Sequence, residues 1–231
     1  MKKSLLLFYQ FLKKPLFLKK QRDKKVLVKD FAALFFLSLF FSTLLVAVFY
    51  LLLHFNLIKE HEGIDLLKQY GVLGTLAIAC LFAPLLEELF FRWHLRDLHG
   101  SIYFVFLSMA GLIVSQIDRP LIQFGLVIGA LLLAVLVIEF LKKRRKIYAI
   151  KLWKKSYPFL FYYTAIVFGL IHLSNYEDLT IADPSFLIYI ASQTFGGLSL
   201  GYLRIKYGLF YSILFHACFN LVAFSLAIAF G

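Results

Sequence analysis

Three ionisable residues stand in an otherwise apolar segment, and their types could support hydrolytic chemistry. The segment Leu81–Trp93 reads LFAPLLEELFFRW and contains Glu87, Glu88 and Arg92. An ionisable side chain near the centre of a membrane helix is costly, and it usually serves a function. If this segment crosses a bilayer, the three residues therefore mark a candidate catalytic site.

Helical spacing separates the roles of the two carboxylates. Neighbouring residues on a helix point about 100° apart, so Glu87 and Glu88 cannot serve the same spot. Glu88 and Arg92 are four residues apart with the acid first, which favours an ion pair on one face. Glu87 is then left without a partner in its own helix and is free to act as a general base. An alternative is a helix end with snorkelling charges, which suits Arg92 better than the shorter Glu87.

Two later apolar segments each contribute further polar residues. His172 follows Phe168 by four residues, and His216 precedes Asn220 by the same spacing. Residues four apart share one face of a helix. Considered alone, each histidine is more often a structural group than a catalyst. Their occurrence together with Glu87 favours a shared site.

The same residues raise the question of a metal. Glu87, His172 and His216 could be three ligands of a catalytic zinc ion with water in the fourth position. The sequence has no HExxH pattern, and two histidines on different helices provide no characteristic spacing. We favour a mechanism without a metal cofactor, and stoichiometric zinc in active protein would contradict that preference.

Composition indicates a membrane protein. The chain is 61% hydrophobic and 18% aromatic, which exceeds what a soluble domain of 231 residues can bury. Its net charge of +12 lies in short blocks between apolar runs, the pattern that orients membrane proteins, so we expect no nucleic-acid partner. Cys80 and Cys218 both lie in apolar segments, where they act as small core residues rather than a disulfide framework.

The apolar runs predict an all-α, polytopic transmembrane bundle of about seven spans. We place the spans near 31–53, 71–92, 101–117, 121–141, 157–176, 185–203 and 207–230. The third is the weakest because it is short. Basic loops alternate with neutral or acidic ones, beginning with ten Lys and Arg residues in 1–29, which predicts a cytoplasmic N-terminus.

The chain divides into three predicted segments. They are a basic cytoplasmic or interfacial arm (1–30), a first transmembrane helix with an outer loop (31–70) and the catalytic core (71–231). The arm is expected to contain a short interfacial helix. Its lipid side would carry four apolar residues, Phe8, Phe11, Leu12 and Phe17.

The three motifs together resemble one known family. EExxxR (Glu87, Glu88, Arg92), FxxxH (Phe168, His172) and HxxxN (His216, Asn220) occur in the order found in the CPBP intramembrane proteases, the CAAX-protease and bacteriocin-processing or Abi family. The resemblance covers roughly residues 71–230.

The resemblance implies an endopeptidase that cleaves a membrane-associated protein or peptide with glutamate-activated water. Glu87 would be the general base, and His172 would hold the water. His216 and Asn220 would donate hydrogen bonds to the oxyanion. The supporting residues would be Glu88, Arg92 and Phe168.

Other functions remain open at this point. The same polar cavity could serve a non-enzymatic transporter or a bacteriocin-immunity-type protein, or the polar groups could only hold helices together. We expect a multi-pass protein of a bacterial cell membrane whose partners are the lipid bilayer and a membrane-associated substrate. A bacterial source makes a prenylated substrate less expected.

Depth in the membrane sets a condition on the site. At the helical rise, Glu87 would lie about 7 Å from the cytoplasmic boundary if its helix ended at Arg92, and about 18 Å if it continued to Gly100. The two histidines lie about 15 to 25 Å deep on the same count. We therefore expect the longer helix, with Arg92 and Arg96 facing a wet cavity and a kink at Pro84.

Overall fold

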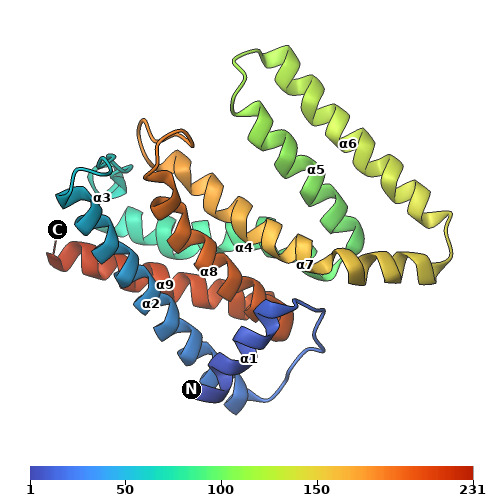
Figure 1. The fold of residues 1–231 in the computed structure, drawn as a ribbon, viewed down its shortest axis with the longest axis horizontal. Helices are drawn as coiled ribbons and strands as arrows, with labels where there is room; N and C mark the ends of the chain where they lie inside the picture. The colour runs from blue at the N-terminus through green and yellow to red at the C-terminus, as the bar shows by residue number, and fades with distance from the viewer. Residues whose placement is uncertain (231) are drawn as a thin grey trace.

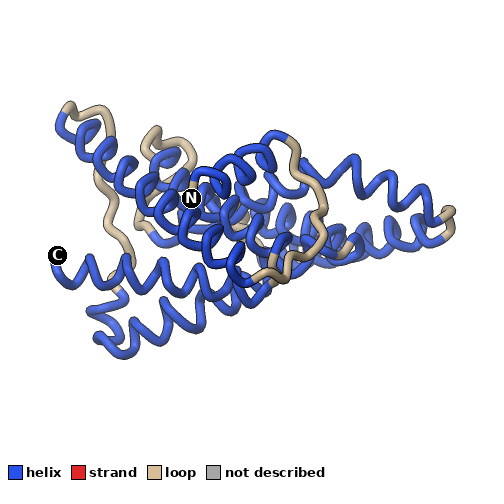
Figure 2. The backbone as a smooth tube through the Cα atoms, turned by 90° about the horizontal axis from the view of Figure 1, so that it is seen from below, coloured by secondary structure: helices blue, strands red, loops and turns tan. Residues whose placement is uncertain are grey.

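The computed structural model describes residues 1–230, and these residues form a helical bundle (Figure 1). The α-helices are α1 (Lys2–Lys13), α2 (Lys24–His54), α3 (Leu66–Ala77), α4 (Ala83–Arg92), α5 (Leu98–Val114), α6 (Pro120–Lys142), α7 (Lys146–Ile171), α8 (Phe186–Lys206) and α9 (Leu209–Phe230). A π-helical turn (Ile78–Phe82) precedes α4, and 3-10 turns follow α4 (Trp93–Arg96) and α7 (His172–Asn175). Figure 2 shows helices and loops throughout the described chain and no strand.

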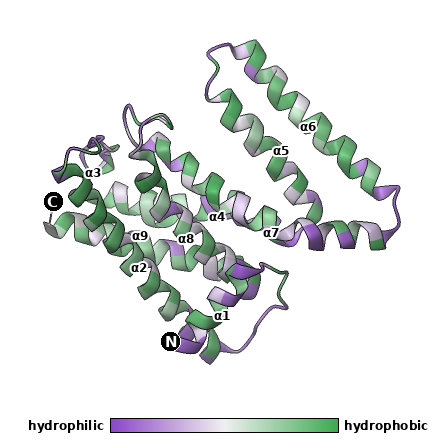
Figure 3. Ribbon diagram, viewed as in Figure 1, coloured by the Kyte–Doolittle hydropathy of each residue, from purple (hydrophilic) through white to green (hydrophobic). Residues whose placement is uncertain are grey.

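The predicted all-α membrane bundle is confirmed. Six helical stretches are long and apolar enough to cross a membrane: Lys24–His54, Leu66–Arg96, Pro120–Lys142, Lys146–Asn175, Phe186–Lys206 and Leu209–Leu226. The remaining one, the third predicted span, is α5, an apolar helix of 17 residues that falls short of that length. Helices α5 and α6 form a hairpin that projects from the bundle, and both are coloured hydrophobic along most of their length (Figure 3). Phe104 and Ser108 of α5 still contact Tyr163 of α7.

Helix α1 packs on the bundle. Phe8 and Phe11 are buried against the ring of Tyr202 on α8, with centroids 5.2 and 5.1 Å away, and Phe11 also meets Phe161 on α7 at 5.0 Å. The expectation that Phe8 and Phe11 face lipid was wrong, because α7 and α8 offer an aromatic surface that buries them. Phe17 remains exposed.

Polar contacts join α2 to α8. The buried carboxylate of Asp30 accepts hydrogen bonds from the Lys206 ammonium and the Tyr207 hydroxyl, both at 2.6 Å. Further along the same helix pair, the hydroxyls of Ser42 and Ser192 lie 2.8 Å apart. A buried charge is tolerated when it is paired and hydrogen-bonded, so this cluster holds the start of α2 against the end of α8.

Glycines allow α7 and α8 to pack closely. A Cβ on Gly197 would lie 3.2 Å from the Cα of Ala165 and 3.3 Å from its carbonyl oxygen, and a Cβ on Gly201 would lie 2.8 Å from the Phe161 ring. Small residues at a membrane helix interface let backbones approach in this way. The contact matters to the site because α7 leads directly to His172.

A loop contact holds the chain just beyond His172. The Ile64 amide donates to the Asn175 carbonyl, and the Glu177 amide donates to the Glu62 carbonyl, both at 2.9 Å. The segment before α3 is thereby fixed to the turn after α7. The first segment leads into the span that carries Glu87, and the second belongs to the turn that begins at His172.

We predict that Gly197→Ala destabilises the bundle, whereas Gly196→Ala does not. The two substitutions share the same change in helix propensity, but a Cβ on Gly196 meets no atom within 4 Å. At Gly197 the methyl group meets backbone, and overpacking of this kind costs about 1–3 kcal/mol. Thermal unfolding of both purified variants in detergent measures the difference. Equal melting temperatures would show that the α7–α8 contact is not tight.

Candidate active site

The second membrane span is segmented rather than continuous. After the π-helical turn, α4 carries Glu87 and Glu88 and ends at Arg92, and the 3-10 turn then continues to Arg96. The predicted extension to Gly100 was wrong, because Asp97 adopts an extended backbone and its carboxylate caps α5 by accepting from the Gly100 amide at 2.6 Å. Near Pro84, where we expected a kink, the chain has the π-helical turn Ile78–Phe82.

Side chains from other helices satisfy the carbonyl groups that this early helix end leaves free. Arg204 on α8 donates from Nε to the Arg92 carbonyl at 3.0 Å and from Nη2 to the Trp93 carbonyl at 3.1 Å. The Tyr157 hydroxyl on α7 donates to the Leu95 carbonyl at 3.0 Å. Helix ends need such partners when they are buried. The span can therefore stop at Arg96 without leaving these groups unpaired.

Glu87 and the two histidines nevertheless converge. The Glu87 Oε2 atom lies 3.7 Å from His172 Nε2 and 3.8 Å from His216 Nε2. The depth estimate failed because it counted residues as if all helices ran parallel. In the structure α4 and α9 cross α7 and α8 at an angle, so residue number does not measure depth (Figure 1).

Hydrogen bonds on the far side of each ring orient the histidines. His172 Nδ1 lies 2.6 Å from the Phe168 carbonyl, and His216 Nδ1 lies 3.2 Å from Glu88 Oε1. A carbonyl and a carboxylate only accept, so Nδ1 carries the hydrogen in both rings. When the rings are neutral, each Nε2 atom therefore carries a lone pair that points toward Glu87.

Three hydrogen-bond acceptors therefore lie close together at the centre of the site. Glu87 Oε2 is buried and has no hydrogen-bond partner among the described residues. Together with the Nε2 atoms of His172 and His216, it surrounds a position that suits a hydrogen-bond donor. A water molecule within hydrogen-bonding distance of Glu87 Oε2 and of either Nε2 atom is compatible with the two separations given above. This is the arrangement that a general base needs.

The predicted ion pair lies behind this centre. Glu88 and Arg92 are both fully buried, and Arg92 Nη1 is 3.2 Å from Glu88 Oε1. The Arg92 guanidinium lies over the Phe168 ring at 3.8 Å, within range of a cation–π interaction. The other Glu88 oxygen accepts a hydrogen bond from Ser212. Burial rules out the snorkelling interpretation of Arg92.

The expectation that Arg92 and Arg96 face a wet cavity was also wrong. Arg92 is enclosed by Glu88 and aromatic side chains, and Arg96 is half-buried and donates to the Ile205 carbonyl at 2.7 Å. Arg92 is held by its ion pair with Glu88 and by the Phe168 ring, and Arg96 is held by backbone carbonyls. The neighbouring helices supply these partners, so neither arginine needs a water-filled cavity.

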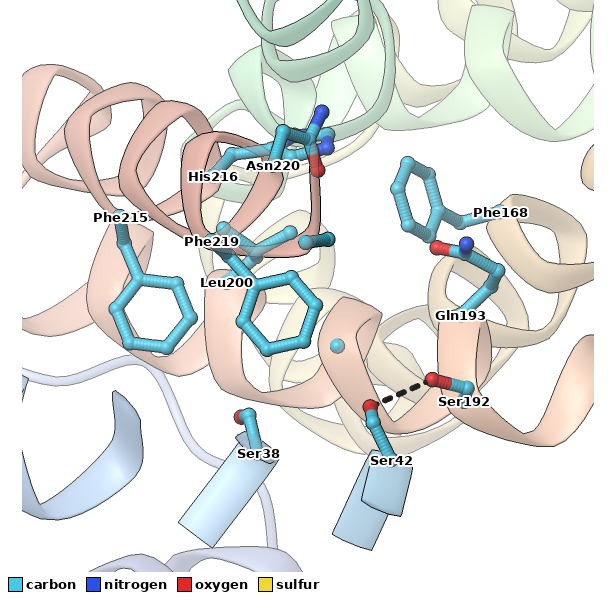
Figure 4. A pocket seen from close by; sticks show the side chains of 12 residues that line it. Ser38, Ser42, Phe168, Ser192, Gln193, Leu200, Phe215, His216, Phe219 and Asn220 are labelled. Atoms are coloured by element: carbon cyan, nitrogen blue, oxygen red, sulfur yellow. Dashed lines mark hydrogen bonds between the residues drawn. The ribbon is translucent and has the colours of Figure 1, made fainter. Parts of the chain in front are cut away.

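Asn220 contacts the second span rather than Glu87. Its Nδ2 donates to the Ala79 carbonyl in the π-helical turn at 2.7 Å. Asn220 and His216 line a pocket of about 110 Å³ together with Phe168 and Gln193. Figure 4 shows His216 and Asn220 side by side on α9, with Phe168 and Gln193 across the pocket.

Two residues that contact the site escaped the sequence analysis. Ser212 bonds Glu88, and Arg204 caps the end of α4. Ser212 could have been found, because it precedes His216 by four residues and so shares the face that carries Asn220. Arg204 has no comparable signal, since a basic residue at the end of a span is normal in a cytoplasmic loop.

The metal hypothesis can be tested against these distances. The donor types of Glu87, His172 and His216 suit zinc, but their separations of 3.7 and 3.8 Å exceed the roughly 3.3 Å between ligands of a tetrahedral ion with 2.0–2.1 Å bonds. No group of three or more His, Cys, Asp or Glu residues in positions 1–230 is arranged to hold a metal ion. The separations are about 0.4–0.5 Å wider than the ion requires, so binding it would need the three side chains to move closer together.

We predict that Arg92→Met destabilises the protein by about 3–5 kcal/mol, because it leaves the Glu88 charge buried without its partner. The double variant Glu88→Gln with Arg92→Met should recover most of the loss. Glutamine is neutral, its carbonyl can still accept from His216, and its NH₂ group can donate to the Ser212 hydroxyl in place of the second Glu88 oxygen. Thermal unfolding of the variants checks this. A double variant no more stable than Arg92→Met would contradict the role given to charge pairing.

Comparison with known proteins agrees with the geometry. A protein-family model described as type II CAAX prenyl endopeptidase Rce1-like matches residues 69–222, which is 154 of the 231 residues. The matched region contains Glu87, His172, His216 and Asn220. No curated protein and no solved structure shows a significant match. The chain belongs to the Rce1-like family of type II CAAX prenyl endopeptidases.

Proposed function

We propose that this protein is an integral-membrane endopeptidase that hydrolyses a peptide bond of a membrane-associated protein or peptide with water activated by Glu87. The observation that carries the proposal is the convergence of Glu87 Oε2 with the Nε2 atoms of His172 and His216. Membership of an endopeptidase family supports cleavage over the transporter and immunity-protein alternatives.

In the proposed first step, water bound among these three atoms attacks the scissile carbonyl carbon. Its proton passes to the Glu87 carboxylate, which acts as the general base. His172 accepts a hydrogen bond from the water and keeps its oxygen in place. The Phe168 carbonyl holds the His172 ring in the required tautomer.

In the second step, the tetrahedral intermediate collapses. The second Nδ2 hydrogen of Asn220 is available to donate to the oxyanion, and His216 would donate from Nε2 to the same acceptor once its ring has taken up a proton from solvent. The protonated Glu87 then transfers its proton to the leaving amine, and the C–N bond breaks. Glu88 orients His216 throughout by accepting from Nδ1.

We predict that Glu87→Gln abolishes cleavage while the protein stays folded and inserted. Glutamine keeps the size of the side chain but cannot accept the proton, and loss of a general base costs about 10²–10⁴-fold in rate. Membrane peptides from cells with the wild type or the variant, compared by proteomics, reveal the substrates and their cleavage.

The matched control is Glu60→Gln, because Glu60 is an exposed residue in the loop before α3. This variant should cleave normally. Unchanged cleavage by Glu87→Gln would refute the proposal. If Glu87→Gln altered transport or protection and neither protein produced a cleavage product, the non-enzymatic alternative would replace it.

We further propose that hydrolysis needs no bound metal. Purified active protein should contain much less than one zinc per chain, and treatment with a chelator should leave the cleavage rate unchanged. Elemental analysis alongside the cleavage assay measures both. Stoichiometric zinc that is lost together with activity, and restored with it, would overturn this part of the proposal.

A further inference from the structure

The backbone two turns before Glu87 has an unusual hydrogen-bond pattern. In the π-helical turn the Ala83 amide donates to the Ile78 carbonyl, five residues earlier. In an α-helix that amide would instead serve Ala79, four residues earlier. The Ala83 amide, which would bond the Ala79 carbonyl in an α-helix, is therefore bonded to Ile78 instead.

Proline removes the other backbone donor. In the π-helical register the Ala79 carbonyl would accept from the amide of residue 84. Residue 84 is Pro84, which has no N–H group. Pro84 is buried, and the turn belongs to a predominantly apolar membrane span. Neither helical register can satisfy the Ala79 carbonyl from the backbone.

Asn220 supplies the missing donor. Its Nδ2 lies 2.7 Å from the Ala79 carbonyl oxygen and reaches it from α9. Because a carbonyl can only accept, the amide must present its NH₂ end to Ala79. The contact uses one of the two Nδ2 hydrogens.

One face of α9 consequently fixes three points of the second span. Ser212 bonds Glu88, His216 faces Glu87, and Asn220 holds the π-helical turn. Ala79 precedes Glu87 by eight residues, or about 12 Å along a helix, so a small tilt at the turn moves the Glu87 carboxylate by about 1 Å. A misplacement of that size can cost about 10²-fold in rate.

We propose that Asn220 is a positioning residue, whose side chain closes the turn opened by Pro84 and thereby sets the distance from Glu87 to His172 and His216. The inference rests on the proposed function, since it concerns the placement of the proposed base. It differs from a role for Asn220 as oxyanion donor alone, because only the positioning role depends on the residue at 84.

That dependence makes a double-mutant cycle decisive. Pro84→Ala restores an amide at residue 84, which is the donor that the π-helical register assigns to the Ala79 carbonyl. With Pro84 present, Asn220→Ala should lower kcat by about 100-fold and change KM less than about threefold. In the Pro84→Ala background the same change should cost at least about tenfold less, because Ala79 no longer needs the side chain.

A matched control separates this coupling from a general effect of the background. Ser225→Ala, on the same helix, removes a hydroxyl that bonds only the Leu221 carbonyl of α9, and its effect should be the same in both backgrounds. A rescue of Asn220→Ala smaller than threefold would overturn the positioning role, and a rescue of threefold or more supports it. If Pro84→Ala does not fold, Pro84→Ser restores the same amide.

The cycle also has a readout that needs no activity. In the Glu87→Gln protein, Asn220→Ala should lower the melting temperature more with Pro84 than with Ala at position 84, and equal shifts would contradict the inference. Failure of the proposed function would appear as unchanged cleavage by Glu87→Gln. Failure of the positioning role would appear as an additive cycle in a protein that still depends on Glu87.

Discussion

The buried carboxylate of Glu88 is the contact on which the rest of the site depends. It is fully enclosed, so its charge must be neutralised and its oxygens bonded within the protein. Arg92 supplies the opposite charge, and Ser212 and His216 supply donors. Because Ser212 and His216 are on α9, their bonds to Glu88 hold α9 against α4. The bond from Nδ1 to Glu88 also sets the orientation of the His216 ring.

Arg92 extends the same constraint to a third helix. Its guanidinium lies over Phe168 on α7, and the Phe168 carbonyl holds the ring of His172. The two histidines that face Glu87 are thus oriented through the charge pair behind it. The proposed base, Glu87, can stay free of partners because its neighbour Glu88 makes the structural contacts.

Backbone satisfaction is the second constraint on the membrane interior. The span that carries Glu87 departs from regular α-helix on both sides of α4, and a bilayer offers no water to bond the carbonyl groups that this releases. Arg204, Tyr157 and Asn220 meet that need from three other positions in the chain. Irregular backbone near the site is therefore tied to particular side chains, and it forms part of how the base is placed.

The sequence by itself determined the helical membrane fold, the pairing of Glu88 with Arg92, and most residues of the candidate site, Ser212 and Arg204 excepted. These features follow from local rules, namely apolar length, the period of the helix and the cost of charge in lipid. Tertiary structure decided where the second span ends, which face of α1 is buried, and that Asn220 holds the Ala79 carbonyl. The physical reason is that each of these depends on donors, acceptors and aromatic surfaces supplied by helices distant in the sequence, and no periodicity within one segment reports on them.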